Sequence, residues 1–281
     1  MTEQRRRAAR TARNYYDTAD ADNFYRRLWG GEDIHLGLYG RDDVDIYSAS
    51  RRTIAAMAAM LPALDADKHI LDLGAGYGGS ARWLAREYAC RVTALNISHR
   101  ENTRNLRLTD QQNLEDRIQV LEGSFEDVPI ADGSIDVVWS QDALLHSGDR
   151  PRVLSEAVRV LEPGGHLIFT DPMQADDARG GLEPILARLQ LQSMGSREFY
   201  EQTLAGLGMR LLRYDDHSDM VARHYGAVLE ALITQRESLQ QDISSEYLER
   251  MAEGLRHWIA GGQQGLLHWG IYLFRKPDFP D

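Results

Sequence analysis

A cluster of glycines directly after a short apolar segment constrains the fold of this chain more than any other feature. The apolar segment runs from Ile70 to Leu73, the glycines fall within 74–79, and a helix-like segment, 80–88, follows at once. Glycine has no Cβ atom, so it lets the backbone turn tightly and pass close to a bound ligand. A strand, a glycine turn and a helix in this order are typical of a doubly wound α/β fold that binds its ligand at the carboxyl end of the strand.

Alternating strand-like and helix-like segments continue this pattern as far as residue 172. The expected strands are 69–74, 91–97, 118–123, 135–140 and 166–170, and the expected helices between them are 80–88, 101–113 and 150–161. Such alternation predicts βαβ units on a parallel sheet. A turn signal, Glu162-Pro-Gly-Gly165, is expected to end the last of these helices and to start the strand after it.

The segments on either side of this core are mainly helical in pattern. We expect four parts: a helical N-terminal lid (1–66), an α/β core (67–172), a helical cap with a sixth strand (173–265), and a final strand that completes the sheet (266–281). Within the cap, 209–214 has the strand pattern and 218–259 a long helical one. Lid and cap would together cover the carboxyl edge of the sheet, where open α/β sheets bind ligands.

Composition excludes several classes of protein. The formal net charge is −11, which disfavours binding to duplex nucleic acid because phosphate contacts need basic patches. The longest apolar runs stay far below the roughly 18 residues of a membrane span, and the arginine-rich segment Met1–Arg13 lacks the apolar stretch of a signal peptide. Cys90 is the only cysteine, so a disulfide framework is excluded. We therefore expect a cytoplasmic protein, a monomer or homodimer, with neither nucleic-acid nor membrane partners and no metal site.

Two kinds of adenosine-containing cofactor are compatible with the glycine turn. The spacing Gly74-x-Gly76-x-x-Gly79 satisfies the dinucleotide fingerprint, but an NAD enzyme also needs an acidic residue about 20 positions further on to bind the ribose hydroxyls. Asn96 stands there instead and brings no charge. This weakens the NAD interpretation, whereas Arg100 leaves an NADP-linked oxidoreductase open as the alternative to S-adenosylmethionine (SAM).

The ends of the later strands favour SAM. Gly123-Ser124-Phe125 follows the third strand and offers a hydroxyl and a ring to an adenine, and Trp139-Ser-Gln141-Asp142 closes the fourth strand. Together with Ile-Leu-Asp-Leu-Gly-Ala-Gly at 70–76, this order resembles the class I SAM-dependent methyltransferases over residues 68–172.

That resemblance implies a Rossmann-like sheet that is mostly parallel with one antiparallel strand, and SAM as the methyl donor. Asn96 replaces the family's usual acidic ribose ligand, a departure that bears on the strength of that contact. The implied cofactor-binding residues are Tyr16, His35, Asp72, Gly74, Ala75, Gly76, Asn96, Ile97, Ser124, Phe125 and Gln141.

Segments spread along the chain, most of them outside the core, resemble a narrower group. The matching segments are 15–17, 24–39, 139–146, 170–173, 194–196, 255–262 and 269–276. Together they are similar to the sarcosine/dimethylglycine N-methyltransferases, which make the osmoprotectant glycine betaine, and the similarity covers almost the whole chain. Related lids occur in enzymes that methylate sterols, tocopherols and natural products. SAM-dependent O- or C-methylation of a natural product or lipid is therefore the alternative function.

An amine acceptor makes specific demands on its pocket. The attacking nitrogen must be neutral, and deprotonating an amine with a pKa of about 10 near pH 7 costs about 4 kcal/mol. A desolvated pocket lowers that pKa, and aromatic faces favour the positive charge that develops on the nitrogen. The aromatic candidates are Tyr16, Tyr25, Trp29, Trp258 and Trp269, each of which could instead be a core packing residue.

The catalytic candidate is His146, which would accept the amine proton directly or through water. Its alternative role is to close the loop after the fourth strand by hydrogen bonding. Arg188 is the candidate partner for a substrate carboxylate, with a solvated surface position as the alternative. Pro172, Met173 and Met194 are expected to shape the acceptor pocket.

Overall fold

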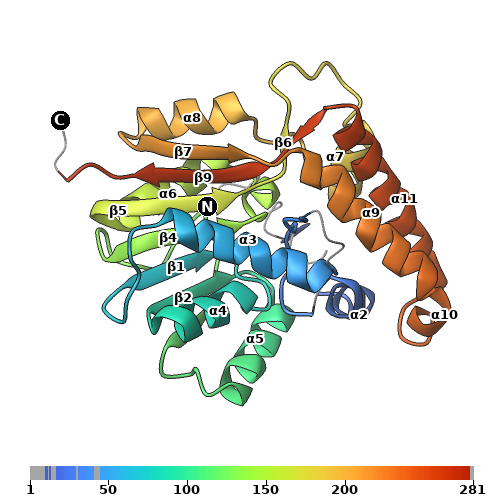
Figure 1. Ribbon diagram of the computed structural model, residues 1–281, viewed down its shortest axis with the longest axis horizontal. Helices are drawn as coiled ribbons and strands as arrows, with labels where there is room; N and C mark the ends of the chain where they lie inside the picture. The colour runs from blue at the N-terminus through green and yellow to red at the C-terminus, as the bar shows by residue number, and fades with distance from the viewer. Residues whose placement is uncertain (1–9, 12, 14–16, 30, 41–44, 279–281) are drawn as a thin grey trace.

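A seven-stranded sheet with the strand order β3-β2-β1-β4-β5-β9-β7 forms the centre of this computed structural model (Figure 1). The strands are β1 (His69–Leu73), β2 (Arg91–Asn96), β3 (Ile118–Glu122), β4 (Ile135–Gln141), β5 (Leu161–Thr170), β7 (Arg210–Asp216) and β9 (Gly270–Arg275). Strands β1 to β5 pair in parallel, whereas β9 is antiparallel to both β5 and β7. The predicted Rossmann-like sheet with one antiparallel strand is confirmed. The structure describes residues 10, 11, 13, 17–29, 31–40 and 45–278.

Helices cover both faces and the carboxyl edge of the sheet. They are α2 (Ala19–Leu28), α3 (Ile46–Met60), α4 (Gly79–Tyr88), α5 (His99–Gln111), η1 (Leu144–His146), α6 (Arg150–Val160), α7 (Glu183–Leu189), α8 (Arg197–Gly206), α9 (Asp219–Thr234), α10 (Arg236–Leu239) and α11 (Ser245–Gln263). A small second sheet pairs β6 (Met173–Gln174) with β8 (Leu267–His268).

The apolar segment before the glycine turn lies at the middle of the main sheet. Ile70, Leu71 and Leu73 are fully buried because β1 is flanked by β2 and β4 and covered on both faces. A strand covered on both faces needs a continuous apolar run rather than an alternating one. This explains why the residues of β1 are mainly apolar and do not alternate with polar ones.

The cap and the first helix pack together beside the carboxyl ends of the parallel strands. Figure 1 shows α9, α10 and α11 at that end of the sheet, with α2 beside α10 and below α9. Buried apolar side chains of α2, α9 and α11 form one cluster, which includes Phe24, Tyr225 and Trp258. Helix α2 near the N-terminus and the helices of the cap therefore form one layer over the carboxyl edge of the sheet. The division of the chain into four parts stays a prediction.

Two expected elements are interrupted in the structure. The helical stretch 218–259 is three helices, because Ser244 starts α11 as its N-cap and accepts a hydrogen bond from Tyr247 N. The expected final strand, 266–274, is broken at Trp269, whose indole Nε1 donates to Asp142 Oδ1 at 2.7 Å. In both places a side chain's tertiary or capping contact overrides the local pattern.

The turn expected at 162–165 lies within β5 instead. Ile135 pairs with Leu161 and Val137 with His166, so the residues between them form an irregularity in the strand rather than its start. Helix α6 does end just before it, at Val160.

A buried histidine of α9 connects the cap to the segment before α3. His224 is fully buried, and its Nδ1 accepts a hydrogen bond from Gly37 N at 3.1 Å. Burial, together with the nearby His35, lowers the pKa of His224 from 6.5 to about 3. The ring is therefore neutral in the folded protein.

This histidine should make the protein sensitive to acid. The unfolded chain binds the proton at a pKa of 6.5 and the folded chain only near 3, so the stabilisation is complete above pH 6.5 and decreases as the pH falls. At pH 5 the loss is about 2 kcal/mol. A His224→Gln variant does not titrate, so the difference in unfolding free energy between wild type and variant should shrink by that amount between pH 7.5 and pH 5 in urea titrations. A difference that does not change with pH would contradict the prediction.

Candidate active site

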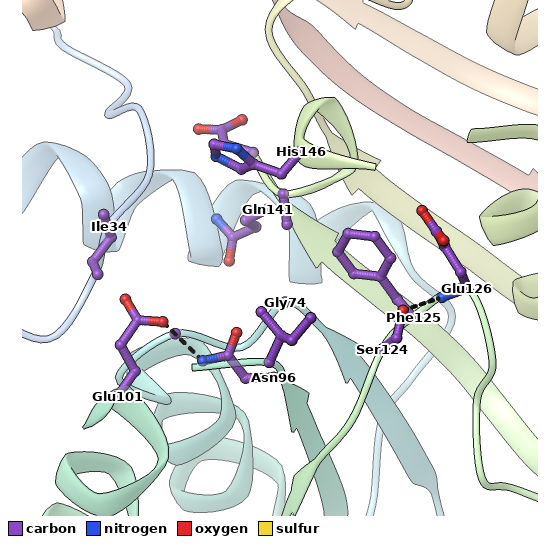
Figure 2. Close-up of a pocket in the computed structure, with 13 residues that line it drawn as sticks. Ile34, Gly74, Asn96, Glu101, Ser124, Phe125, Glu126, Gln141 and His146 are labelled. Carbon is purple, nitrogen blue, oxygen red and sulfur yellow. Dashed lines mark hydrogen bonds between the residues drawn. The ribbon is translucent and has the colours of Figure 1, made fainter. Parts of the chain in front are cut away.

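A cavity of about 690 Å³ lies at the carboxyl ends of β1, β2 and β4 (Figure 2). The predicted cofactor residues that line it are Gly74, Gly76, Asn96, Ile97, Ser124, Phe125 and Gln141. Figure 2 shows Asn96 and Glu101 on one side of this space, Phe125 on another, and Gln141 below His146. Tyr16 lies outside the described residues, and Ala75 sits in the turn without lining the cavity.

Two glycines of the turn lie too close to neighbouring residues to carry a side chain. Gly74 has φ +79°, and a Cβ there would overlap the side chain of Ala143. A Cβ on Gly79 would overlap the carboxylate of Asp33, which belongs to the segment before α3. Gly74 therefore lets the turn pack against Ala143 at the edge of the cavity, and Gly79 lets the lid segment pack on α4.

One side of the cavity pairs an amide with a carboxyl group. Asn96 Nδ2 donates to Glu101 Oε2 at 2.8 Å, and both side chains are buried. Burial raises the pKa of Glu101 to about 7. Glu101 lines the cavity, so the acidic group missing at the end of β2 comes from the first turn of α5.

Our sequence analysis did not identify Glu101. The available signal was Ser98-x-x-Glu101, a capping-box pattern directly after the strand. Ser98 is the N-cap of α5, and its Oγ accepts from Glu101 N at 3.1 Å. The glutamate side chain is hydrogen-bonded to Asn96.

Buried polar groups near the glycine turn lack protein partners. Asp72 Oδ2 and Gln141 Nε2 are buried and have no hydrogen-bond partner among the described residues. Burial, with a smaller contribution from Asp33, raises the pKa of Asp72 to about 7. Gln141 is held in place through its Oε1, which accepts from Trp139 Nε1 at 2.9 Å. A carboxyl oxygen and an amide N–H of this kind suit the ammonium and carboxylate of an amino-acid group, as SAM carries.

A second cavity of about 460 Å³ adjoins the first, since Ile34, Asp142 and His146 line both. The predicted acceptor residues Tyr25, Trp29, Pro172 and Arg188 line it, and so does His35, which we had expected at the cofactor. Met173 and Met194 are not among the residues that line it, and both side chains are buried in the apolar clusters. Their role in shaping the acceptor pocket stays a prediction.

Aromatic rings from three helices form a continuous wall of the second cavity. Tyr25 and Trp29 have ring centroids 5.3 Å apart, and Trp29 lies 5.8 Å from Tyr225. Tyr225 in turn stacks on Trp258 at 4.7 Å. Tyr25, Trp29 and Trp258 are among the aromatic candidates predicted from the sequence. Tyr225 is not, because the apolar pattern of α9 is that of a helix packed in a core.

Asp142 holds the junction of the two cavities together. Its backbone has φ +50°, and its carboxylate accepts hydrogen bonds from Leu36 N at 2.6 Å, Trp269 Nε1 at 2.7 Å and Thr170 Oγ1 at 2.8 Å. These donors come from the lid segment, the strand break before β9 and the end of β5. The carboxylate therefore fixes the relative positions of three chain segments around the site.

His146 also faces both cavities. Burial, assisted by the positive charge of Arg150, lowers the pKa of His146 to about 4. The imidazole is therefore neutral near pH 7. Among the described residues, His146, Ile34 and Asp142 are the ones that line both cavities.

Two further observations concern the described residues as a whole. No group of three or more His, Cys, Asp or Glu side chains among them could hold a metal ion. None of their helices is long and apolar enough to cross a membrane.

Comparison with known proteins agrees with this geometry. Residues 71–169 match the family model described as a methyltransferase domain. The chain is 53% identical to the sarcosine/dimethylglycine N-methyltransferase of Halorhodospira halochloris, over 96% of this chain and 97% of that protein. It is 48% identical to the dimethylglycine N-methyltransferase of Parasynechococcus marenigrum, over 95% of each chain.

A solved structure gives the same result. The crystal structure of a Galdieria sulphuraria protein assigned to the sarcosine dimethylglycine methyltransferases superposes with a TM-score of 0.88 at 43% identity, covering 95% of this chain and 100% of that one. Similarity of this extent, over nearly the full length, shows the family. The chain is a SAM-dependent methyltransferase and belongs to the family of the sarcosine/dimethylglycine N-methyltransferases.

Proposed function

We propose that this enzyme methylates the nitrogen of sarcosine and dimethylglycine to give glycine betaine. The observation that carries the proposal is the second cavity, which combines an aromatic wall with Arg188 and shares residues with the cofactor cavity. The full-length similarity to relatives named for these acceptors supports it. A cytoplasmic location and a monomeric or homodimeric state are proposed with it from the sequence.

The first cavity would hold SAM, which supplies an electrophilic methyl group. We assign Asp72 and Gln141 to its amino-acid end, because their unpaired polar atoms match an ammonium and a carboxylate. Asn96 and Glu101 would bind the ribose hydroxyls. Ser124, whose Oγ already accepts from Glu126 N at 3.2 Å, would donate its hydroxyl hydrogen to the adenine, and Phe125 would contact its face.

The second cavity would hold the amine. Tyr25, Trp29, Tyr225 and Trp258 present their rings from α2, α9 and α11. Such rings favour the positive charge of the product by about 0.5–2 kcal/mol for each good contact, and their apolar surface lowers the pKa of the bound amine. Arg188 would pair with the acceptor's carboxylate. The amine and the carboxylate of one small molecule are then recognised at once.

His146 is better suited to hold the acceptor than to keep its proton. The pKa of its imidazole is about 4, roughly six units below that of an amine. Moving the proton of an amine that keeps its aqueous pKa onto this ring would therefore cost about 8 kcal/mol, and the cost decreases as the pocket lowers the pKa of the amine. We propose that the amine releases its proton to water as it enters the pocket, and that the neutral ring contacts the acceptor at the junction of the cavities and orients its nitrogen for in-line transfer. The neutral nitrogen of dimethylglycine carries no hydrogen, so the ring positions it by contact alone, whereas the N–H of sarcosine can donate to the ring.

Glu101 should make a measurable contribution to cofactor binding. At pH 8, above the pKa of about 7 of this carboxyl group, replacing Glu101 by glutamine removes a charged acceptor. Hydrogen bonds to charged groups contribute about 1.5–3 kcal/mol. We expect affinity for S-adenosylhomocysteine, measured by calorimetry, to fall about 10- to 150-fold. Glu115→Gln, at an exposed position after α5, should have no effect. Equal affinities in the two variants would remove Glu101 from the site.

The acceptor is tested with a panel. The purified enzyme and SAM are incubated with glycine, sarcosine, dimethylglycine and dimethylethanolamine, and the product masses are followed. We expect transfer to sarcosine and dimethylglycine and little to dimethylethanolamine, which has no carboxylate. Transfer to none of the amino acids, or a preference for the carboxylate-free amine, would overturn the proposal.

A further inference from the structure

A groove of about 1400 Å³ lies between α7, α11 and the N-terminal residues Thr11 and Thr18, next to the acceptor cavity. Arg188 and Leu189 line both the groove and that cavity. The guanidinium proposed to hold the acceptor's carboxylate therefore stands where the two spaces meet. A molecule in the groove would contact this side chain.

Helix α11 carries a notch that receives this guanidinium. A Cβ on Gly254 would lie 2.5 Å from Arg188 Nε and 2.6 Å from its Nη1, so any side chain at 254 displaces the arginine. One turn earlier, Met251 Sδ lies 3.1 Å from Arg188 Nη2. Glycine is less favourable than alanine in the interior of a helix. At Gly254 the space left by the missing side chain is occupied by Arg188.

The groove also has a charge that suits an anion. Among the described residues lining it, the charged side chains are those of Arg188, Arg250 and Glu253, so the cations outnumber the carboxylate. Arg250 is positioned over the Tyr247 ring, with 5.1 Å from its Cζ to the ring centroid. The protein as a whole has a formal net charge of −11, so this groove is a locally basic surface on an acidic molecule.

We propose that the acceptor enters through this groove, where Arg250 attracts its carboxylate, and that Gly254 seats Arg188 to receive it. The inference rests on the proposed function, since it requires an acceptor with a carboxylate. Gly254 is a positioning residue, because it acts only through Arg188. Arg250 acts on the approach of the acceptor and not on the methyl transfer.

The first test replaces Gly254 by alanine. We expect kcat/KM for dimethylglycine to fall about 10- to 100-fold, mainly through KM, with unchanged affinity for S-adenosylhomocysteine. The melting temperature should stay equal or rise, because alanine favours the helix. Gly226→Ala on α9 is the matched control, since a Cβ there meets nothing within 4 Å. Unchanged KM in Gly254→Ala, or a loss of cofactor affinity with it, would overturn the assignment.

The second test replaces Arg250 by glutamine. At about 10 mM ionic strength, where the screening length is about 30 Å, we expect kcat/KM to fall roughly 3- to 10-fold with kcat unchanged. The effect should vanish at about 0.5 M salt. Arg256→Gln, an exposed arginine of the same helix that does not line the groove, should have no effect. Equal behaviour of the two arginine variants would overturn the entry route.

These outcomes are separable from the proposed function. If the wild-type enzyme transfers methyl groups to no carboxylate-bearing acceptor, the proposed function and this inference both fail. If the wild type is active and the Gly254 and Arg250 variants behave like their controls, only the groove inference fails.

Discussion

Replacing Arg188 by methionine should lower kcat/KM for dimethylglycine about 10²- to 10³-fold. Methionine keeps most of the length of the side chain but removes the positive charge, so the acceptor's carboxylate would be buried without a partner. Breaking a buried, hydrogen-bonded charge pair costs about 2–5 kcal/mol, and each 1.4 kcal/mol corresponds to a factor of ten. Steady-state kinetics with saturating SAM measure the change.

The controls for Arg188 separate charge recognition from damage to the fold. Affinity for S-adenosylhomocysteine should stay unchanged, since Arg188 does not line the cofactor cavity. Arg197→Met should leave kcat/KM unchanged, because Arg197 pairs with Glu201 and lies over the ring of Tyr214. Arg188→Lys should give an intermediate value, because it keeps the charge but loses the planar fork. A similar loss in the Arg197 variant would contradict the assignment.

Replacing Asp142 by alanine should lower the free energy of unfolding by about 3–5 kcal/mol. Its carboxylate accepts hydrogen bonds from Leu36 N, Thr170 Oγ1 and Trp269 Nε1. Each buried donor left without an acceptor costs about 1–3 kcal/mol. Because these donors hold the lid segment and β9 around the site, activity should fall with stability. Urea denaturation at pH 7.5 measures the change.

Two variants make the Asp142 result specific. Asp142→Asn should lose less, since its remaining oxygen still accepts from Trp269 and Thr170 while its amide faces the Leu36 N–H. Asp127→Ala, at an exposed position, should change the free energy of unfolding by about 0.5 kcal/mol or less. A loss in Asp142→Ala as small as that of Asp127→Ala would mean that the three hydrogen bonds contribute little.

Local patterns were sufficient for the central sheet. The run Ile70–Leu73 could be recognised as a buried strand because a strand covered on both faces has only apolar neighbours. The glycines after it could be placed at a ligand because positive φ and close approach both exclude a side chain. These are properties of short segments, so they can be read without knowing the rest of the fold.

The same reasoning gave a less complete view of the cofactor cavity. Asn96 could be placed at the end of β2 from the alternation of strands and helices. The contribution of Glu101 could not, because a glutamate in a first helical turn usually caps its own helix or faces solvent. Only the packing of α5 against β2 turns its carboxyl group into the cavity beside Asn96.

The sequence by itself determined the sheet, the glycine turn and the kind of cofactor, since each depends on residues close together in the chain. Only the tertiary structure decided which residues meet the acceptor. Tyr25, His146, Arg188 and Tyr225 lie far apart in sequence and share one cavity, whereas Met173 and Met194 are taken into the core. The physical reason is that a pocket wall and a core residue have the same apolar pattern, and only the packing of distant helices leaves one of them uncovered. Burial of the His146 ring by the same packing lowers its pKa to about 4, which no local pattern of the glycine turn or of the strands around it could reveal.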